Sequence, residues 1–147
     1  MNNCITHQEL VKKASKWLKN TIGCPVILTE HVGGFSETPD AIGWKHGHFS
    51  ILVECKCSKS DFYKDKKKIW RQPLMEEDAL GTCRYYLFPE GLFNSYEKIP
   101  KKWGILELKN NRIKIIKESD KFNRSMTGLR AEISLLWSKL RKINKCS

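Results

Sequence analysis

Long apolar runs are missing from this chain of 147 residues. A helix that spans a membrane needs about 20 consecutive, mostly apolar residues, and polar or charged residues interrupt every hydrophobic stretch of this sequence far sooner. Residues 1–13 also lack the apolar segment and the small-residue cleavage site of a secretory signal. These absences argue against the membrane-spanning and secreted classes, so we expect a cytoplasmic protein with no membrane partner.

A metal-binding cysteine pattern is missing as well. The chain has 6 cysteines, but no two of them form a C-x-x-C pair and the gaps between them are irregular. Zinc sites and disulfide frameworks have regular spacings. We therefore interpret the cysteines as reduced thiols that pack as small apolar side chains.

Acidic residues are scarce in the last third of the chain. Overall, 27 Lys and Arg oppose 16 Asp and Glu, which gives a formal net charge of +11. Residues 1–97 contain 13 basic and 12 acidic side chains, whereas residues 98–147 contain 14 and 4, a net charge of +10. Nucleic acid is a natural partner of such a surface, because each neutralised phosphate releases a condensed counterion. A solubilising surface is the alternative that charge alone leaves open.

Length and residue pattern predict one α/β domain over residues 1–147. Thr6 and Glu9 have the spacing of a capping box ahead of a helical apolar pattern, and branched or aromatic runs between turn residues predict strands. The expected helices cover about residues 7–20, 58–72 and 127–143, and the expected strands 25–31, 40–45, 48–58, 82–88, 103–109 and 112–117. We predict a mixed sheet flanked by helices over about residues 7–108, followed by a basic extension, about 109–147, with a hairpin and a helix.

The strand expected at 48–58 carries two opposite charges on one side. Cys55 and Cys57 share the apolar side of this alternating strand, whereas Glu54 and Lys56 lie on the other side. Charged residues on a strand of this kind are costly unless they are paired or useful. Glu54 and Lys56 are therefore the first candidates for a functional site.

A hairpin brings Asp40 close to this pair. If residues 45–47 form a three-residue loop, Trp44 faces His48, and Asp40 faces Leu52, diagonal to Glu54 and on the same side of the sheet. A two-residue turn would point Asp40 to the opposite side. A site that contains Asp40 and Glu54 therefore needs an odd loop or a β-bulge.

Two carboxylates beside an ammonium group form a candidate site for Mg²⁺, which prefers oxygen ligands. A bound Mg²⁺ can contact a phosphate oxygen and lower the pKa of an attacking water, and the lysine can balance the developing negative charge. This chemistry is phosphodiester hydrolysis. The alternative is a surface salt bridge between Glu54 and Lys56, with Asp40 as an ordinary turn residue.

The arrangement resembles a known family. Pro39-Asp40, 13 residues and then Glu54-Cys55-Lys56, on the third strand of a helix, strand, strand, strand, helix, strand order, look like the PD-(D/E)XK nuclease superfamily. The following stretches 58–67 and 84–89 are similar to MmcB-like DNA-repair proteins and related phage proteins.

This resemblance implies a restriction-endonuclease-like fold and a set of site residues. It implies Asp40 and Glu54 as metal ligands with the backbone carbonyl of Cys55, Lys56 as the catalytic lysine, and Mg²⁺, or alternatively Mn²⁺, as the cofactor. Glu9 stands where some members carry an acidic residue, although its capping role explains it equally well.

A basic helix after the catalytic strand is expected to position phosphates without reading bases. Its candidate residues are Lys59, Lys64, Lys66, Lys67, Lys68 and Arg71, with Gln72 in a region where some relatives carry an extra polar active-site residue. A solvated face is the alternative for these lysines. We assign no chemistry to the 4 histidines, because they show no ligand spacing.

The functional expectation is a Mg²⁺-dependent nuclease that acts on DNA in preference to RNA, with an endonuclease favoured, in DNA repair or phage DNA processing. The alternative is a catalytically inactive nuclease-like module that binds nucleic acid or a protein. The apolar stripe of the C-terminal helix also leaves a homodimer open.

Overall fold

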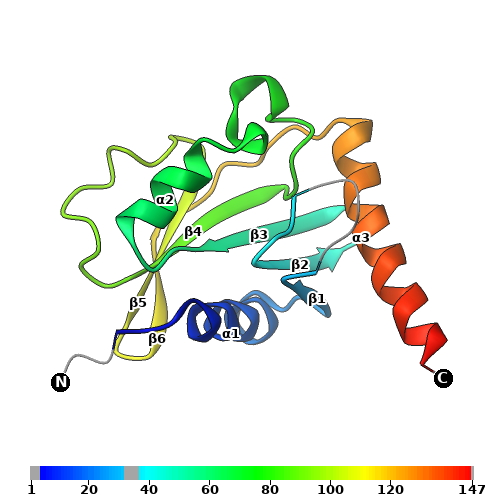
Figure 1. Cartoon of the computed structure of the whole chain (residues 1–147), viewed down its shortest axis with the longest axis horizontal. Helices are drawn as coiled ribbons and strands as arrows, with labels where there is room; N and C mark the ends of the chain where they lie inside the picture. The colour runs from blue at the N-terminus through cyan, green and yellow to red at the C-terminus, as the bar shows by residue number, and fades with distance from the viewer. Residues whose placement is uncertain (1–3, 32–36, 147) are drawn as a thin grey trace.

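The structure, a computed structural model, describes residues 4–31 and 37–146 (Figure 1). All six strands belong to one sheet, in the order β1-β2-β3-β4-β5-β6. The helices are α1 (His7–Trp17), α2 (Lys59–Lys66) and α3 (Met126–Lys145), and the strands are β1 (Val26–Thr29), β2 (Ala41–His46), β3 (Phe49–Cys55), β4 (Cys83–Pro89), β5 (Gly104–Lys109) and β6 (Arg112–Lys117).

The sheet is mixed, as predicted. β1, β2 and β3 form an antiparallel meander, β4 and β5 run parallel to β3, and β6 returns antiparallel to β5. The parallel step from β3 to β4 requires a crossover connection, which α2 and the following turns provide. A helix, three strands, a helix and a strand therefore follow one another along the chain.

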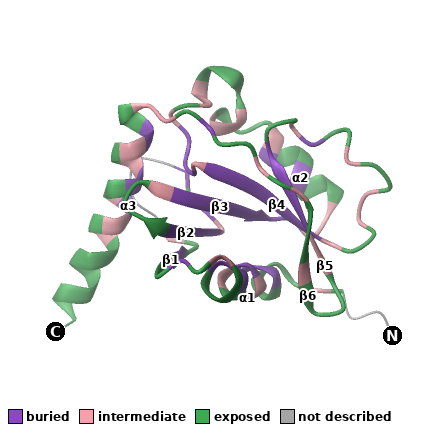
Figure 2. Ribbon diagram, turned by 180° about the vertical axis from the view of Figure 1, so that it is seen from behind, coloured by how far each residue is buried: buried purple, intermediate pink, exposed green. Residues whose placement is uncertain are grey.

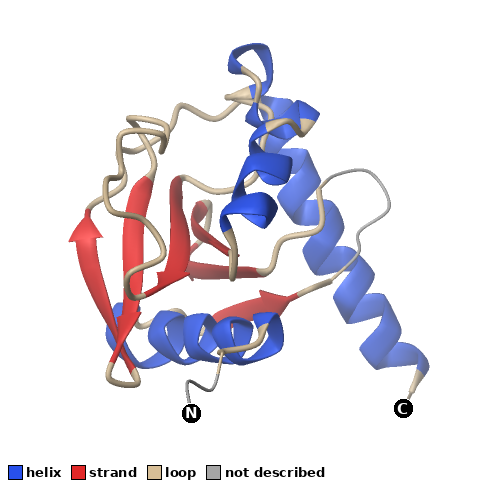
Figure 3. Cartoon of the chain, turned by 60° about the vertical axis from the view of Figure 1, so that its left-hand side comes forward, coloured by secondary structure: helices blue, strands red, loops and turns tan. Residues whose placement is uncertain are grey.

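Both faces of the sheet are covered, and this makes the central strands apolar on both sides. α1 packs on one face through Leu10, Ala14 and Trp17, against the side of β3 that carries Cys55. α2 and the first half of α3 lie over the other face (Figure 3). Phe62, Leu135 and Leu52 belong to the cluster of buried apolar side chains there. The side of β3 that holds Glu54 and Lys56 is consequently an interior surface.

The first helix begins where the sequence predicts. The Thr6 hydroxyl accepts a hydrogen bond from the Glu9 amide, and the Glu9 carboxylate accepts one from the Thr6 amide, so the capping box is confirmed. A π-helical turn at 18–22 continues the helix, and Gly23 ends it with a φ of 83° that favours glycine.

The second helix is shorter than the predicted span of 58–72. It starts at the Ser58 cap but ends at Lys66, and two 3-10 turns at 69–71 and 73–75 follow. The chain turns there because Arg71 bonds back to Asp65, and Ile69 is 61% exposed. The prediction of one continuous helix was wrong for this reason.

α3 covers the sheet only with its first half. Gly128, Glu132 and Leu135 are buried, whereas Trp137, Leu140 and the last turns are exposed (Figure 2). The predicted periodicity is therefore correct for the helix, but much of its apolar stripe is not core. In the described residues, no helix has the length and apolar character needed to cross a membrane.

The Glu132 carboxylate fixes α3 to the sheet. It accepts hydrogen bonds from Trp44 Nε1 at 3.0 Å, Ser50 Oγ at 2.7 Å and the Gly81 amide at 2.9 Å, and Arg124 lies 2.7 Å away. We expect Glu132→Ala to lower the free energy of unfolding by about 3–5 kcal/mol, because it leaves buried donors and a buried guanidinium without their acceptor. Urea unfolding measures this loss.

Glu97→Ala is the matched control, because Glu97 is exposed. It should change the free energy of unfolding by no more than about 0.5 kcal/mol. Equal stability of the two variants would contradict the role of Glu132.

Candidate active site

A β-bulge in the β2–β3 hairpin gives Asp40 its orientation. His46 pairs with Phe49, whereas Trp44 pairs with Ser50 and Ala41 with Val53, so the register shifts between Trp44 and His46. The predicted partner of Trp44 was His48, whereas the observed partner is Ser50, two residues further along β3. A shift of two residues leaves each side chain on the predicted side of the sheet. The next step of the register places Asp40 beside Glu54. The predicted need for an odd loop or bulge is confirmed.

Asp40, Glu54 and Lys56 meet at the carboxyl end of β3. Lys56 Nζ lies 3.1 Å from Glu54 Oε2 and 3.7 Å from Asp40 Oδ2. Asp40 Oδ2 also accepts a hydrogen bond of 2.8 Å from the Cys55 amide. The structure therefore brings the three predicted catalytic side chains together, and the role of the Cys55 carbonyl stays a prediction.

Asp65 is a third carboxylate at this point, and the sequence did not single it out. Its Oδ1 lies 3.4 Å from Lys56 Nζ, and its Oδ2 accepts a hydrogen bond of 2.6 Å from the Tyr86 hydroxyl. Asp65 occupies the buried side of α2, two turns after the Ser58 cap. Because Asp65 lies in a lysine-rich segment, the sequence pattern indicated an ordinary exposed charge at this position.

Arg71 is part of this buried cluster. Its side chain is only 3% exposed and contacts Glu37 Oε2 at 2.5 Å, Asp65 Oδ2 at 2.8 Å and Glu54 Oε1 at 3.5 Å. The predicted role of Arg71 as a surface cation for nucleic acid therefore does not fit its position, because its guanidinium is engaged inside the protein. Gln72 donates to the Lys66 and Lys68 carbonyls, which secures the turn after α2.

The electrostatic field of the cluster keeps Lys56 charged. Burial opposes the charge, but the carboxylates of Glu54, Asp65 and Asp40 outweigh it and raise the pKa of Lys56. Burial likewise opposes the charge of Asp65, yet Arg71 and Lys56 hold its pKa well below the usual range. Burial, with the neighbouring Asp40 carboxylate, raises the pKa of Glu54. A permanently protonated Lys56 can stabilise negative charge but cannot serve as a general base near neutral pH.

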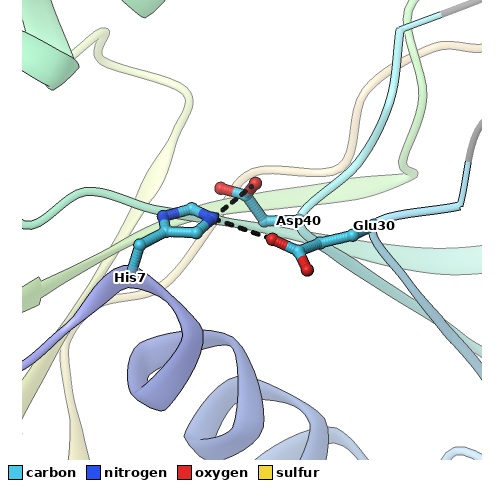
Figure 4. Close-up of side chains that lie close together, drawn as sticks. All are labelled: His7, Glu30 and Asp40. Carbon is cyan, nitrogen blue, oxygen red and sulfur yellow. Dashed lines mark hydrogen bonds and ion pairs between the residues drawn. The ribbon is translucent and has the colours of Figure 1, made fainter.

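A second group of ligand atoms lies on the outer side of Asp40 (Figure 4). His7 Nε2 is 3.3 Å from Asp40 Oδ1 and 3.1 Å from Glu30 Oε1, and the three ligand atoms lie within 4.8 Å of one another. His7 opens α1, and Glu30 follows β1, where its amide donates to the Asp40 carbonyl at 3.0 Å. No sequence pattern joins these residues, since only the packing of α1 against the sheet brings them together.

The two groups differ in how they suit a metal ion. Between Asp40 and Glu54 the ammonium of Lys56 already balances the carboxylates, and Glu54 is 1% exposed. His7, Glu30 and Asp40 face outward and offer one nitrogen and two carboxylate oxygens. Such a mixed set suits Mn²⁺ or another first-row metal better than Mg²⁺, which takes oxygen ligands.

A hollow of about 400 Å³ opens at the candidate site. It is lined by His7, Cys55, Lys56, Asp61, Lys64, Asp65 and Lys68. Two predicted nucleic-acid contacts, Lys64 and Lys68, thus lie at the candidate site. Lys66 instead donates to the Lys98 carbonyl, and Lys59 lies over the Phe93 ring, so both point toward the 93–98 loop. Lys67 caps the end of α2 through its backbone amide.

Comparison with known proteins supports the fold alone. No family model matches the chain, and no curated protein does. A solved structure, the SPO1766 protein of unknown function from Silicibacter pomeroyi, is similar, with a TM-score of 0.71 and 19% sequence identity. The similarity covers 96% of this chain and 90% of that one. It shows that the mixed α/β architecture is shared along nearly the whole chain.

Proposed function

We propose that this chain is a metal-dependent nuclease that hydrolyses phosphodiester bonds in DNA, with endonucleolytic cleavage, in DNA repair or phage DNA processing. The observation that carries the proposal is the convergence of Asp40, Glu54 and Lys56 on the inner side of β3, beside an open hollow. The resemblance to PD-(D/E)XK nucleases and a restriction-endonuclease-like reading of the mixed sheet support it.

Each residue of the candidate site has a separate role in the proposed hydrolysis. Asp40 would hold a cation on its outer side together with His7 and Glu30, and a cation bound there would supply a Lewis acid for the phosphate and for an attacking water. Lys56 directs its ammonium group at the negative charge that develops on the phosphate. Glu54 and Asp65 hold Lys56 in place and charged. Lys64 and Lys68 bind flanking phosphates at the rim of the hollow.

The test is a cleavage assay on labelled duplex, single-stranded and branched DNA and on RNA, with Mg²⁺ or Mn²⁺ titrated. We expect cleavage of DNA, a lower metal requirement with Mn²⁺ than with Mg²⁺, and complete loss in chelator. Asp40→Asn should lower the rate by about 10²–10³-fold, because it removes the charge that holds the cation and several kcal/mol of transition-state stabilisation. His7→Ala should reduce the preference for Mn²⁺.

Asp120→Asn is the matched control, since Asp120 is exposed and far along the chain from the site. Its rate should equal that of the unsubstituted protein. Cleavage by Asp40→Asn at that same rate would remove Asp40 from the mechanism.

A second candidate function is a nuclease-like module that binds DNA without hydrolysing it. One observation favours it: both carboxylate oxygens of Glu54 face cations, Oε2 toward Lys56 and Oε1 toward Arg71 at 3.5 Å. Salt-sensitive DNA binding with no turnover in either metal would support this candidate over the enzyme.

A further inference from the structure

A second pocket lies behind Arg71, away from the hollow that contains Lys56. Its volume is about 230 Å³, and the turns after α2 and the segments around residues 100–103 and 122 form its walls. Its lining includes Trp70, Arg71, Arg84, Lys101, Lys102 and Phe122. The proposed nuclease chemistry uses only one of them indirectly, Arg71.

Arg84 is a buried cation that forms no ion pair with a carboxylate of the described segments. Its side chain is 2% exposed, and it donates only to backbone carbonyls, from Nε to Gly81 and from Nη2 to Glu76 and Ala79. Across residues 4–31 and 37–146, no carboxylate forms an ion pair with Arg84, and its Nη1 makes no hydrogen bond. Burial lowers the pKa of Arg84 to about 10. Buried guanidinium groups are costly unless an anion compensates them.

The other charges of the pocket leave room for an anion. Arg71 is compensated by Glu37, Asp65 and Glu54, and Lys102 pairs with Glu76. Lys101 is exposed at the rim and, within the described segments, forms no ion pair. Two positive charges, on Arg84 and Lys101, therefore have no ion-pair partner among the described residues, and Glu37 and Glu76 act on Arg84 only from beyond ion-pair distance. A phosphate monoester carries about −1.5 to −2 charges near pH 7, which matches them.

The aromatic wall indicates what is attached to the phosphate. Trp103 stacks on Tyr86 and lies under Arg71, and Phe122 lies under Arg84 at 3.9 Å, so both rings have partners. Trp70 has no ring or cation contact in the part of the chain that the structure describes. A half-buried indole without a partner offers a stacking surface for a nucleobase.

We propose that this pocket binds a nucleotide through its terminal phosphate, with the phosphate on Arg84 Nη1 and Lys101 and the base against Trp70. The nucleotide is either free or the phosphorylated end of a nucleic-acid strand, since the two share this chemistry. The proposal concerns binding alone and does not depend on hydrolysis at Asp40 and Lys56. The carbonyl contacts of Arg84 fix the 76–81 loop through Nε and Nη2 and leave Nη1 for the ligand.

Calorimetry and tryptophan fluorescence test the proposal on the full chain in chelator, which prevents any cleavage. We expect dAMP to bind and deoxyadenosine, which lacks the phosphate, to bind at least tenfold more weakly. A comparison of oligonucleotides that carry a 5′-phosphate or a 5′-hydroxyl shows whether the ligand is a free nucleotide or the phosphorylated end of a strand. A preference for the phosphorylated strand assigns the pocket to strand ends, whereas binding of dAMP without such a preference assigns it to free nucleotides.

Lys101→Ala and Trp70→Ala should each weaken binding of the preferred ligand about fivefold or more, and Lys114→Ala, an exposed lysine on β6, should leave it unchanged. Arg84→Lys retains the charge and should also weaken binding, but the other two variants decide the question if it does not fold. Absence of binding by both dAMP and the phosphorylated strand would overturn the proposal. Undiminished binding by both Lys101→Ala and Trp70→Ala would overturn it as well.

Discussion

Replacing Lys56 by methionine is expected to reduce DNA cleavage by about 10²–10³-fold, the typical cost of removing one preorganised charge from a phosphate or oxyanion site. The side chain is buried, and three carboxylates keep it protonated, so its contribution is positive charge at a fixed position. DNA binding should remain within a few-fold, because Lys64 and Lys68 still line the hollow. Single-turnover cleavage and fluorescence anisotropy separate the two effects.

Two further variants show whether the charge itself is responsible. Lys56→Arg retains a cation beside Glu54 and should recover part of the lost rate, although its planar group fits the position less well. Lys114→Met makes the same substitution at an exposed position of β6 and should cleave normally. Full activity of Lys56→Met would remove Lys56 from the mechanism and favour a site elsewhere on the chain.

The predictable part of the candidate site is the part encoded within one hairpin. The alternation of 48–58 placed Glu54 and Lys56 on one side, and the parity of the hairpin decided whether Asp40 could join them. Neither step requires knowledge of distant segments. The bulge between Trp44 and His46 shifts the register by one residue, and together with the two-residue turn at 47–48 it displaces the predicted pairing by two, which leaves these sides unchanged.

The missed part depends on tertiary contacts between distant segments. The sequence predicted Arg71 to be one exposed cation of a lysine-rich helix. In the structure it contacts Glu37, which lies 34 positions earlier and outside any regular element. His7 and Glu30 meet Asp40 only because the start of α1 packs beside the end of β1. Local periodicity carries no information about such contacts, which arise from how the layers pack.

Helix periodicity also failed to predict burial at the end of the chain. The stripe of Ile133, Leu140 and Ile143 has regular helical spacing, but these residues are more than half exposed. Ile133 is exposed because α3 turns Glu132 and Leu135 to the sheet instead, and Leu140 and Ile143 are exposed because the helix extends past the sheet. Periodicity describes which residues share a face, whereas burial depends on whether another layer is present opposite that face.

Arg71→Met is expected to lower the free energy of unfolding by about 3–5 kcal/mol at neutral pH, because it leaves the buried carboxylates of Glu37, Glu54 and Asp65 without their shared guanidinium. The loss should shrink in acid. The folded-state pKa of Asp65 is lowered mainly by Arg71, so this stabilisation is present above the pKa of an unfolded aspartate and disappears as the pH falls toward the lower, folded value. Urea unfolding at neutral pH and at progressively lower pH measures both effects.

Lys68→Met is the informative comparison, because Lys68 pairs with the same carboxylate, Asp65 Oδ1, at 3.1 Å but is 52% exposed. Solvent screens that pair, so its loss should cost no more than about 1 kcal/mol. Burial of the cation, rather than proximity to Asp65, is thus what separates the two variants. Equal losses for Arg71→Met and Lys68→Met, or a loss for Arg71→Met that does not change with pH, would contradict a buried charge cluster beneath the candidate site.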